Sequence, residues 1–193
     1  MSSIKDKILS SKLKTKDPDV FAEFYDAYVN KIYRFIYFKV ATAEEAEDIA
    51  AETFLKIWQH LFENKPIEHL NAFVYQVARN LVIDFYRKKA QQKLVLEENM
   101  DAEAMAAIPD PKLAVDKKME LASDVAELED CLRQMKEEYR EVIILKYFDQ
   151  LNVGEIAKIL GKSRGAVRVL AHRALKTLAE LMEKKSHEEP RLN

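Results

Sequence analysis

Cationic side chains are concentrated in one stretch of this sequence, residues 151–176. Six Lys or Arg residues against the single anion Glu155 give this stretch a net charge of +5, whereas the whole chain has a formal net charge of −2. Lysine and arginine bind phosphate groups without regard to base sequence, and arginine can also read a guanine edge through two hydrogen bonds. We therefore interpret the stretch as a DNA-binding segment, with a helical hairpin that carries a solvated basic face as the alternative. The residues expected to contact DNA are Ser163, Arg164, Gly165, Arg168, His172, Arg173 and Lys176.

The local sequence predicts how these side chains are positioned. Asn152 and Glu155 have the spacing of a capping box at the start of one helix, and Gly161 can adopt the left-handed conformation that ends it. Ser163 can cap a second helix, and Gly165 near its start would let the backbone approach a phosphate. Two helices joined by so short a turn, the second one basic, predict a helix-turn-helix. The apolar positions of the second helix keep near-helical spacing: Ala166, Val167, Leu170, Ala174 and Leu178.

A second group of polar and aromatic side chains belongs to a helix predicted to follow the loop at residues 63–70. Asn71 is expected to cap this helix, and its buried stripe is predicted to be Phe73, Val74, Val77, Ala78, Leu81, Val82 and Phe85. The other side carries cations, an amide and two tyrosines, Tyr75 and Tyr86. Proteins use such side chains to bind single-stranded DNA, since cations follow phosphates, rings stack on bases and amides read base edges. Pairing of Arg79 with Asp84, or plain surface polarity, explains the pattern equally well. The candidate contacts are Asn64, Lys65, His69, Asn71, Arg79, Asn80, Asp84, Arg87 and Lys88.

A third stretch, residues 43–58, is predicted to form an acidic amphipathic helix. Thr42 and Glu45 have the spacing of a capping box. The inward stripe is predicted to be Ala46, Ile49, Ala50, Thr53, Phe54 and Ile57. The acidic residues Glu44, Glu47, Asp48 and Glu52 face elsewhere, which is typical of a solvated surface. A carboxylate-bridged metal site would need Glu-x-x-His pairs, and none of the four histidines has a glutamate three residues before it.

Several classes of protein are excluded or disfavoured by the whole sequence. Three glycines, five prolines and 33% charged residues indicate a helix-rich protein rather than a β fold. No apolar run approaches the roughly 20 residues that span a bilayer, so we expect a cytoplasmic protein without membrane insertion. Cys131 is the only cysteine, which excludes an internal disulfide and a multi-cysteine metal site. An enzyme is disfavoured because a glycine-rich phosphate loop and a plausible nucleophile–base pair are both missing, and we expect no cofactor, metal or small-molecule substrate.

The order of these segments predicts an all-α fold with two small helical domains joined by an acidic linker. The N-terminal domain is expected over residues 1–90, where aromatic side chains from Phe21 to Phe38 provide much of the core. Residues 91–121 form the predicted linker, in a region whose net charge from Gln91 to Asp130 is −7. The helix-turn-helix domain is expected over residues 122–185, and residues 186–193 are expected to be a disordered tail.

Three stretches in this order resemble the extracytoplasmic-function group of bacterial RNA polymerase sigma factors. EDIAAETFLKIW resembles the polymerase-binding helix of that family, and FVYQVARNLVIDFYRKK resembles its promoter-melting helix. The segment from Glu137 to Leu178 resembles its reader of the upstream promoter element. The resemblance implies core RNA polymerase and promoter DNA as partners, often an anti-sigma protein as inhibitor, and no catalysis by the chain itself. Its candidate polymerase-binding residues are Asp48, Glu52, Leu55 and Trp58.

A free-standing transcriptional regulator is the second function that the helix-turn-helix would fit. Such a regulator would also need an upstream ligand pocket or a phosphoacceptor domain, usually built with strands, and the sequence offers no sign of either. A regulator should protect its DNA site alone, whereas a sigma factor should do so only with core polymerase. This difference separates the two hypotheses by experiment.

Overall fold

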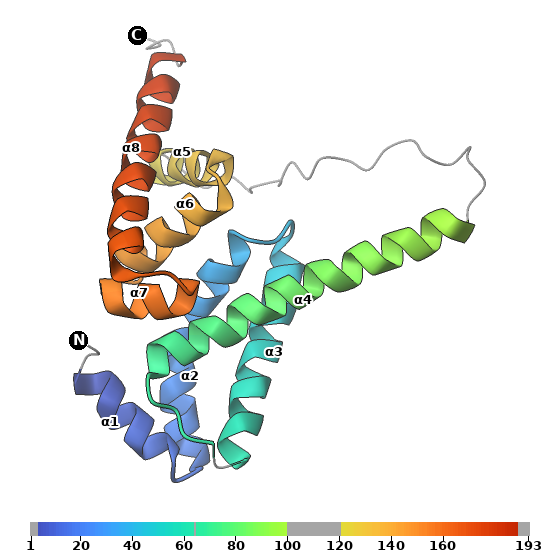
Figure 1. Ribbon diagram of the computed structural model, residues 1–193, viewed down its shortest axis with the longest axis vertical. Helices are drawn as coiled ribbons and strands as arrows, with labels where there is room; N and C mark the ends of the chain where they lie inside the picture. The colour runs from blue at the N-terminus through green and yellow to red at the C-terminus, as the bar shows by residue number, and fades with distance from the viewer. Residues whose placement is uncertain (1–3, 64, 100–120, 189–193) are drawn as a thin grey trace. The chain divides into compact units, whose positions relative to one another are not determined.

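The computed structural model describes residues 4–63, 65–99 and 121–188, and all regular secondary structure in these ranges is helical (Figure 1). The chain divides into two compact units. The first is formed mainly by residues 9–68 and 73–99, and the second mainly by residues 121–188. The predicted all-α fold with two helical domains is confirmed.

Four helices form the N-terminal half of the chain: α1 (Ile4–Leu13), α2 (Pro18–Tyr37), α3 (Ala43–Phe62) and α4 (Leu70–Asn99). Helix α2 begins as predicted, because Asp17 accepts a hydrogen bond from the backbone N–H of Asp19 at 2.9 Å and Pro18 lies in the first turn. Helix α3 begins with the predicted capping box. The Thr42 hydroxyl accepts the Glu45 N–H at 3.1 Å, and the Glu45 carboxylate accepts the Thr42 N–H at 3.3 Å. Two polar side chains thus satisfy backbone donors that a helix start leaves open.

Aromatic side chains dominate the core between α2 and α3. The Phe24 ring is fully buried and lies edge-on to Phe54, with ring centroids 5.8 Å apart. Phe21 makes an edge contact with Trp58 at 4.5 Å, farther along the same pair of helices. The inward stripe predicted for α3 is confirmed, since all six of its residues are buried. Each such aromatic pair adds roughly 0.5–1.5 kcal/mol beyond the area it buries.

The buried face of α4 differs from the predicted stripe at Tyr75. This side chain was expected on the polar side, but it is fully buried and meets the Phe35 ring edge-on at 5.2 Å. Phe73, Val77 and Phe85, which were expected in the core, are only half-buried. The core-facing stripe is therefore rotated by about one residue from the predicted one. A tyrosine has an apolar ring that packs as well as phenylalanine, so its hydroxyl is a poor indicator of exposure.

The C-terminal unit contains α5 (Leu121–Gln134), α6 (Glu137–Ile143), the π-helical turn η1 (Ile144–Phe148), α7 (Val153–Leu160) and α8 (Arg164–Glu188). Helix α8 packs against α5, α6 and α7. The buried side chains of this unit include Leu132, Val142, Ile143, Leu145, Ile156, Ile159, Val167, Ala171 and Ala174. Cys131 is fully buried, which confirms its predicted role as a small hydrophobic core residue.

A wide turn carries the chain from α6 into α7. The Asp149 N–H donates to the Ile144 carbonyl oxygen at 3.0 Å, a hydrogen bond that spans five residues instead of the four of an α-helix. The Leu151 N–H then donates to the Leu145 carbonyl at 2.9 Å. Gln150 adopts a φ of 56°, which reverses the chain direction before α7 begins.

The helix-turn-helix forms as the sequence predicts. The Asn152 side chain accepts the Gly154 and Glu155 N–H groups at 2.9 and 3.1 Å, and Glu155 in turn accepts the Asn152 N–H at 3.0 Å. Gly161 ends α7 with a φ of 64°, in the left-handed region. The Ser163 hydroxyl accepts a hydrogen bond from the backbone N–H of Ala166 at 3.1 Å, three residues later.

The limits of two helices differ from the sequence-based expectation. Helix α4 begins at Leu70, so Asn71 lies within its first turn, and the prediction that Asn71 caps the helix is wrong. Helix α4 continues to Asn99, so residues 91–99 of the predicted linker are helical. Helix α8 reaches Glu188, three residues into the predicted tail. The rest of that linker, residues 100–120, and of the tail, residues 189–193, lie outside the described residues.

No helix in the described ranges is both long enough and apolar enough to cross a membrane.

Candidate functional site

The cationic surface of α8 is held in place by the apolar face on its other side. Val167, Ala171 and Ala174 are buried against the rest of the C-terminal unit. The predicted DNA-facing residues, all of which are exposed, are Ser163, Arg164, Gly165, Arg168, His172, Arg173 and Lys176. Packing fixes the rotation of the helix, so these side chains form one continuous basic face. A face of this kind on the second helix of a helix-turn-helix fits the DNA major groove.

Two of the predicted contact residues also have structural roles. The Ser163 hydroxyl caps α8 through the hydrogen bond described above. The Arg164 guanidinium lies against the start of α7, where a Cβ atom added to Gly154 would be 3.4 Å from one of its nitrogens. That distance is an ordinary van der Waals contact, so Arg164 packs beside Gly154, a neighbour ten residues away in sequence that no local pattern indicates.

Two exposed apolar side chains also lie on α8, among the cations. Val169 is 51% exposed and Leu175 is 45% exposed. Leu170, between them in sequence, is buried and belongs to the core. Apolar contact with the methyl group of thymine is one way in which proteins read the major groove. Val169 is therefore a further candidate for base contact, next to Arg168.

A second candidate site is a cavity of about 390 Å³ between the end of α3 and the middle of α4. Its lining residues are Lys56, Gln59, His60, Glu63, Phe73, Val77, Asn80, Leu81 and Asp84. The cavity is largely open to solvent, and its volume leaves room for a group the size of one nucleobase, which would stay partly exposed there. Its lining combines apolar surface with an amide, a carboxylate and an imidazole, which can read the edge of a base.

Only some of the residues predicted to bind single-stranded DNA line this cavity. Asn80 and Asp84 line it, and Asp84 forms an exposed ion pair with Arg87 at 3.7 Å. Arg79 is half-buried. Lys65, which pairs with Glu63, and the residues His69, Arg87 and Lys88 are exposed, whereas the Asn71 side chain is buried. Asn64 lies outside the described residues.

His60 is a cavity residue that sequence reasoning missed. Its ring packs against Phe73 with centroids 4.4 Å apart, and its Nε2 atom is buried without a hydrogen-bond partner in the described part of the chain. Burial lowers the pKa of His60, and nearby Lys65 lowers it further, against a smaller opposing effect of Glu63. A lowered pKa favours the neutral imidazole at neutral pH, so His60 contributes an uncharged aromatic ring to the cavity wall. Phe73 is thirteen residues away in sequence, so no local pattern indicates this pairing.

The predicted docking face on α3 is exposed along one side of the helix. Asp48 and Glu52 are exposed, and Leu55, one turn farther along, is 55% exposed. Trp58 is half-buried, because its ring packs between Phe21 and Phe62 at 4.5 and 5.0 Å. An exposed leucine beside carboxylates provides apolar contact area together with charge complementarity to a basic partner.

Two regions of the chain match known protein families. Residues 24–92 match Sigma-70 region 2, and residues 126–178 match Sigma-70, region 4. The first interval contains α3, α4 as far as residue 92 and the cavity between them, and the second contains α7 and α8 as far as residue 178. The fold resembles that of CnrH in its complex with the cytosolic domain of CnrY, with a TM-score of 0.66 and 18% identity over 93% of this chain and 97% of that one. It also resembles the sigma factor RpoE of Bartonella quintana in complex with the anti-sigma factor NepR, with a TM-score of 0.63 and 20% identity over 84% and 96% of the two chains.

Relatives of higher sequence identity define the family. The ECF RNA polymerase sigma factor SigW of Bacillus subtilis is 32% identical over 175 residues, which cover 86% of this chain and 91% of SigW. The ECF RNA polymerase sigma factor BldN of Streptomyces coelicolor is 30% identical over 179 residues. This match covers 90% of the present chain but only 64% of the length of BldN. The chain therefore belongs to the extracytoplasmic-function group of RNA polymerase sigma factors, as its sequence predicted. Its function is that of a promoter-directing sigma factor, and the free-standing regulator is not favoured.

Proposed function

We propose that three surfaces of this chain divide the work of promoter recognition. The basic face of α8 reads the upstream promoter element. The α3–α4 cavity holds one extruded base of the melted strand, and the exposed side of α3 with Asp48, Glu52 and Leu55 docks on core polymerase. The chain performs no catalysis itself and acts in the cytoplasm. An anti-sigma protein is its proposed inhibitor, since CnrH and RpoE, which share its fold, were solved with CnrY and the anti-sigma factor NepR.

The observation that supports this proposal is that one chain carries both an exposed cationic helix face and a separate cavity lined by polar and apolar side chains. A cationic helix suits duplex DNA, in which phosphates supply affinity and base edges supply specificity. A cavity lined by Asn80, Asp84 and His60 suits a single base outside the stack, because unpaired bases expose edges that side chains can reach. Two such contacts held on one polymerase gain affinity through effective concentration, so each can be weak alone.

Run-off transcription with purified core polymerase tests the function as a whole. We expect a transcript with a defined start site when chain and polymerase are combined, and little specific DNA protection by the chain alone. Strong sequence-specific protection by the chain alone, unaffected by polymerase, would instead support a free-standing regulator.

Charge reversal on α3 tests the docking face. Replacing Asp48 and Glu52 by lysine should abolish polymerase binding and leave the helical fold intact, because both side chains are exposed. Replacing Glu23 and Asp26, two exposed residues of α2, by lysine makes the same change in net charge on another helix, and should have little effect. Equal losses in both double variants would show that net charge, and not this surface, decides binding.

Asn80→Ala tests the cavity. Polymerase binding should be retained, while promoter opening, followed by permanganate reactivity of unpaired thymines, should slow. Gln91→Ala is a matched control, because Gln91 is exposed on α4 about three turns beyond Asn80. Normal opening by Asn80→Ala would remove the cavity from the proposed mechanism.

A further inference from the structure

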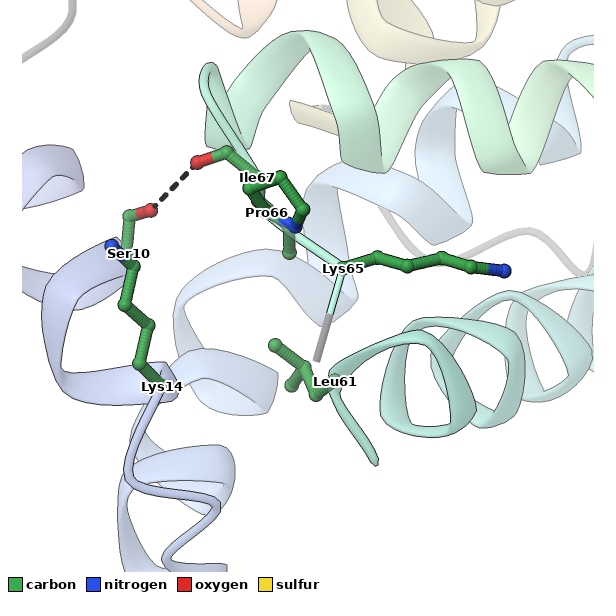
Figure 2. Close-up of a pocket in the computed structure, with 6 residues that line it drawn as sticks. All are labelled: Ser10, Lys14, Leu61, Lys65, Pro66 and Ile67. Atoms are coloured by element: carbon green, nitrogen blue, oxygen red, sulfur yellow. Dashed lines mark hydrogen bonds between the residues drawn. The ribbon is translucent and has the colours of Figure 1, made fainter. Parts of the chain in front are cut away.

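The end of α1 and the turn after it lie against the segment that connects α3 to α4. Leu9 and Leu13 of α1 are buried, with exposed fractions of 8% and 2%. Two polar side chains from the same region contact the connecting segment. The Ser10 hydroxyl donates to the Ile67 carbonyl oxygen at 3.4 Å, as Figure 2 shows. The Lys16 ammonium donates to the Phe62 carbonyl oxygen at 3.3 Å, at the end of α3.

Lys16, which contacts Phe62, lies in a turn with an unusual backbone conformation. Lys16 has a φ of 57°, a conformation that residues other than glycine rarely adopt. Backbone hydrogen bonds from Thr15 to Lys12 and from Lys16 to Leu13, at 2.9 and 3.2 Å, hold the turn closed. The Lys16 ammonium also lies 5.6 Å from the centre of the Phe62 ring. Ser10 and Lys16 thus hold the connecting segment near both of its ends.

Close packing does not fix this segment on the side of α1. A second cavity of about 250 Å³ lies there, lined by Ser10, Lys14, Leu61, Lys65, Pro66 and Ile67 (Figure 2). In the same view Lys65 extends away from α1. His60 and Glu63, from the same part of the chain, line the first cavity. This pocket is partly open to solvent, so few protein atoms pack against Pro66 and Ile67 from the side of α1. Their position therefore depends more on the two hydrogen bonds than it would in a filled core.

We propose that Ser10 and Lys16 are positioning residues, which hold Phe62 and Ile67 in place and through them set the selectivity of the base-holding cavity. This inference rests on the proposed function of that cavity. When the two hydrogen bonds are removed, the segment relaxes toward the empty space beside α1. The wall of the first cavity at His60 and Glu63 then moves, and the fit to the extruded base is lost. Neither side chain touches the DNA.

The test uses the full chain bound to core polymerase, on a promoter identified by run-off transcription. Binding is measured on four pre-melted templates that differ only in the extruded base. Ser10→Ala and Lys16→Met should each reduce the preference for the correct base roughly two- to ten-fold, the range for loss of one hydrogen bond. The double variant should lose more. Polymerase affinity should stay unchanged, and the thermal unfolding midpoint should fall by only a few degrees, roughly the shift that the loss of one hydrogen bond causes.

Conservative and neighbouring substitutions separate positioning from general effects. Ser10→Thr and Lys16→Arg keep a donor and should restore the preference. Ser11→Ala changes an exposed serine next to Ser10 and should have no effect. Lys14→Met removes a charge at the second cavity, but the Lys14 side chain makes no hydrogen bond within the described residues, so selectivity should be retained.

The outcomes distinguish this inference from the proposed function on which it rests. If Asn80→Ala loses base preference while Ser10→Ala and Lys16→Met keep it, the cavity holds the base and the positioning role is overturned. If Asn80→Ala also keeps it, the base-holding function itself fails. If Lys14→Met loses as much preference as Lys16→Met, charge near the DNA is the cause, and the hydrogen-bond explanation is overturned.

Discussion

Two glycines of the helix-turn-helix offer a test in which folding and DNA binding should change in different ways. Gly161 has a φ of 64°, and a Cβ atom added there would meet no heavy atom within 4 Å. Gly165 lies in the first turn of α8, and its added Cβ would come no closer than 3.9 Å to the Ser163 hydroxyl oxygen. Neither alanine substitution is therefore opposed by a steric clash with the rest of the protein. The predicted effects come from the backbone alone.

The two substitutions should have opposite effects on stability. Gly161→Ala forces an alanine into the left-handed region, which costs about 1–2 kcal/mol. Gly165→Ala should stabilise the protein by about 0.5–1 kcal/mol, since alanine restricts the unfolded chain and favours the helix. Chemical unfolding of the full chain, followed by circular dichroism, would give both values. A neutral Gly161→Ala would refute the backbone argument.

The same pair should behave differently on DNA. The first amides of a helix have no partner within it and bind phosphates well, and Gly165 is exposed there. A methyl group at Gly165 would obstruct that approach, and losing one hydrogen bond to a charged group lowers affinity about ten-fold or more. Gly165→Ala should thus be more stable but bind its promoter more weakly as holoenzyme, measured by fluorescence anisotropy. Unchanged affinity would remove Gly165 from the DNA contact.

Three further predictions concern other parts of the chain. Arg168→Ala should cost about 1–3 kcal/mol in promoter binding and relax the preference at one base position, as measured with a set of single-base promoter variants. Thr42→Ala should destabilise the N-terminal unit by about 0.5–2 kcal/mol, because the Glu45 N–H at the start of α3 loses the hydroxyl oxygen that accepts its hydrogen bond. Chemical unfolding followed by Trp58 fluorescence would measure this loss of stability. The pKa of His60 is lowered in the folded chain, so near this pH the unfolded chain binds more protons than the folded one. The free energy of unfolding should therefore fall as the pH drops from 7 through the ordinary histidine pKa of 6.5 toward the folded pKa. His60→Gln should reduce this slope, and identical pH profiles for the two proteins would contradict the assignment.

Features set by a few neighbouring residues could be predicted from the sequence. The capping boxes at Thr42 and Asn152, the turn at Gly161 and the cap at Ser163 all depend on side chains within four residues of the backbone groups that they bind. Their physics is local, so the packing of the domain does not alter it. The exposed basic face of α8 could be predicted for the same reason, because helical periodicity alone separates it from Val167 and its neighbours.

Features set by packing between helices could not be predicted. The α3–α4 cavity depends on how two helices cross, and nothing in the sequence near His60 or Asn80 fixes that geometry. Tyr75 was misplaced because residue type is a weak guide to which edge of an apolar stripe is buried. The continuation of α4 to Asn99 was missed because a change of charge was taken as its end. Acidic residues do not stop a helix, and the first proline after α4 is Pro109.

The wide turn at Ile144–Phe148 has a consequence for comparing this chain with its relatives. A hydrogen bond that closes over five residues encloses one residue more than an α-helical turn. Buried residues of α6 and α7 lie on both sides of this turn, among them Ile143 and Ile156. Deleting one residue here would turn the segment into an ordinary α-helical turn. We therefore expect single-residue gaps in alignments of this family to fall between Ile144 and Gln150, where the length of the chain can change over evolution without displacing the helix that reads DNA.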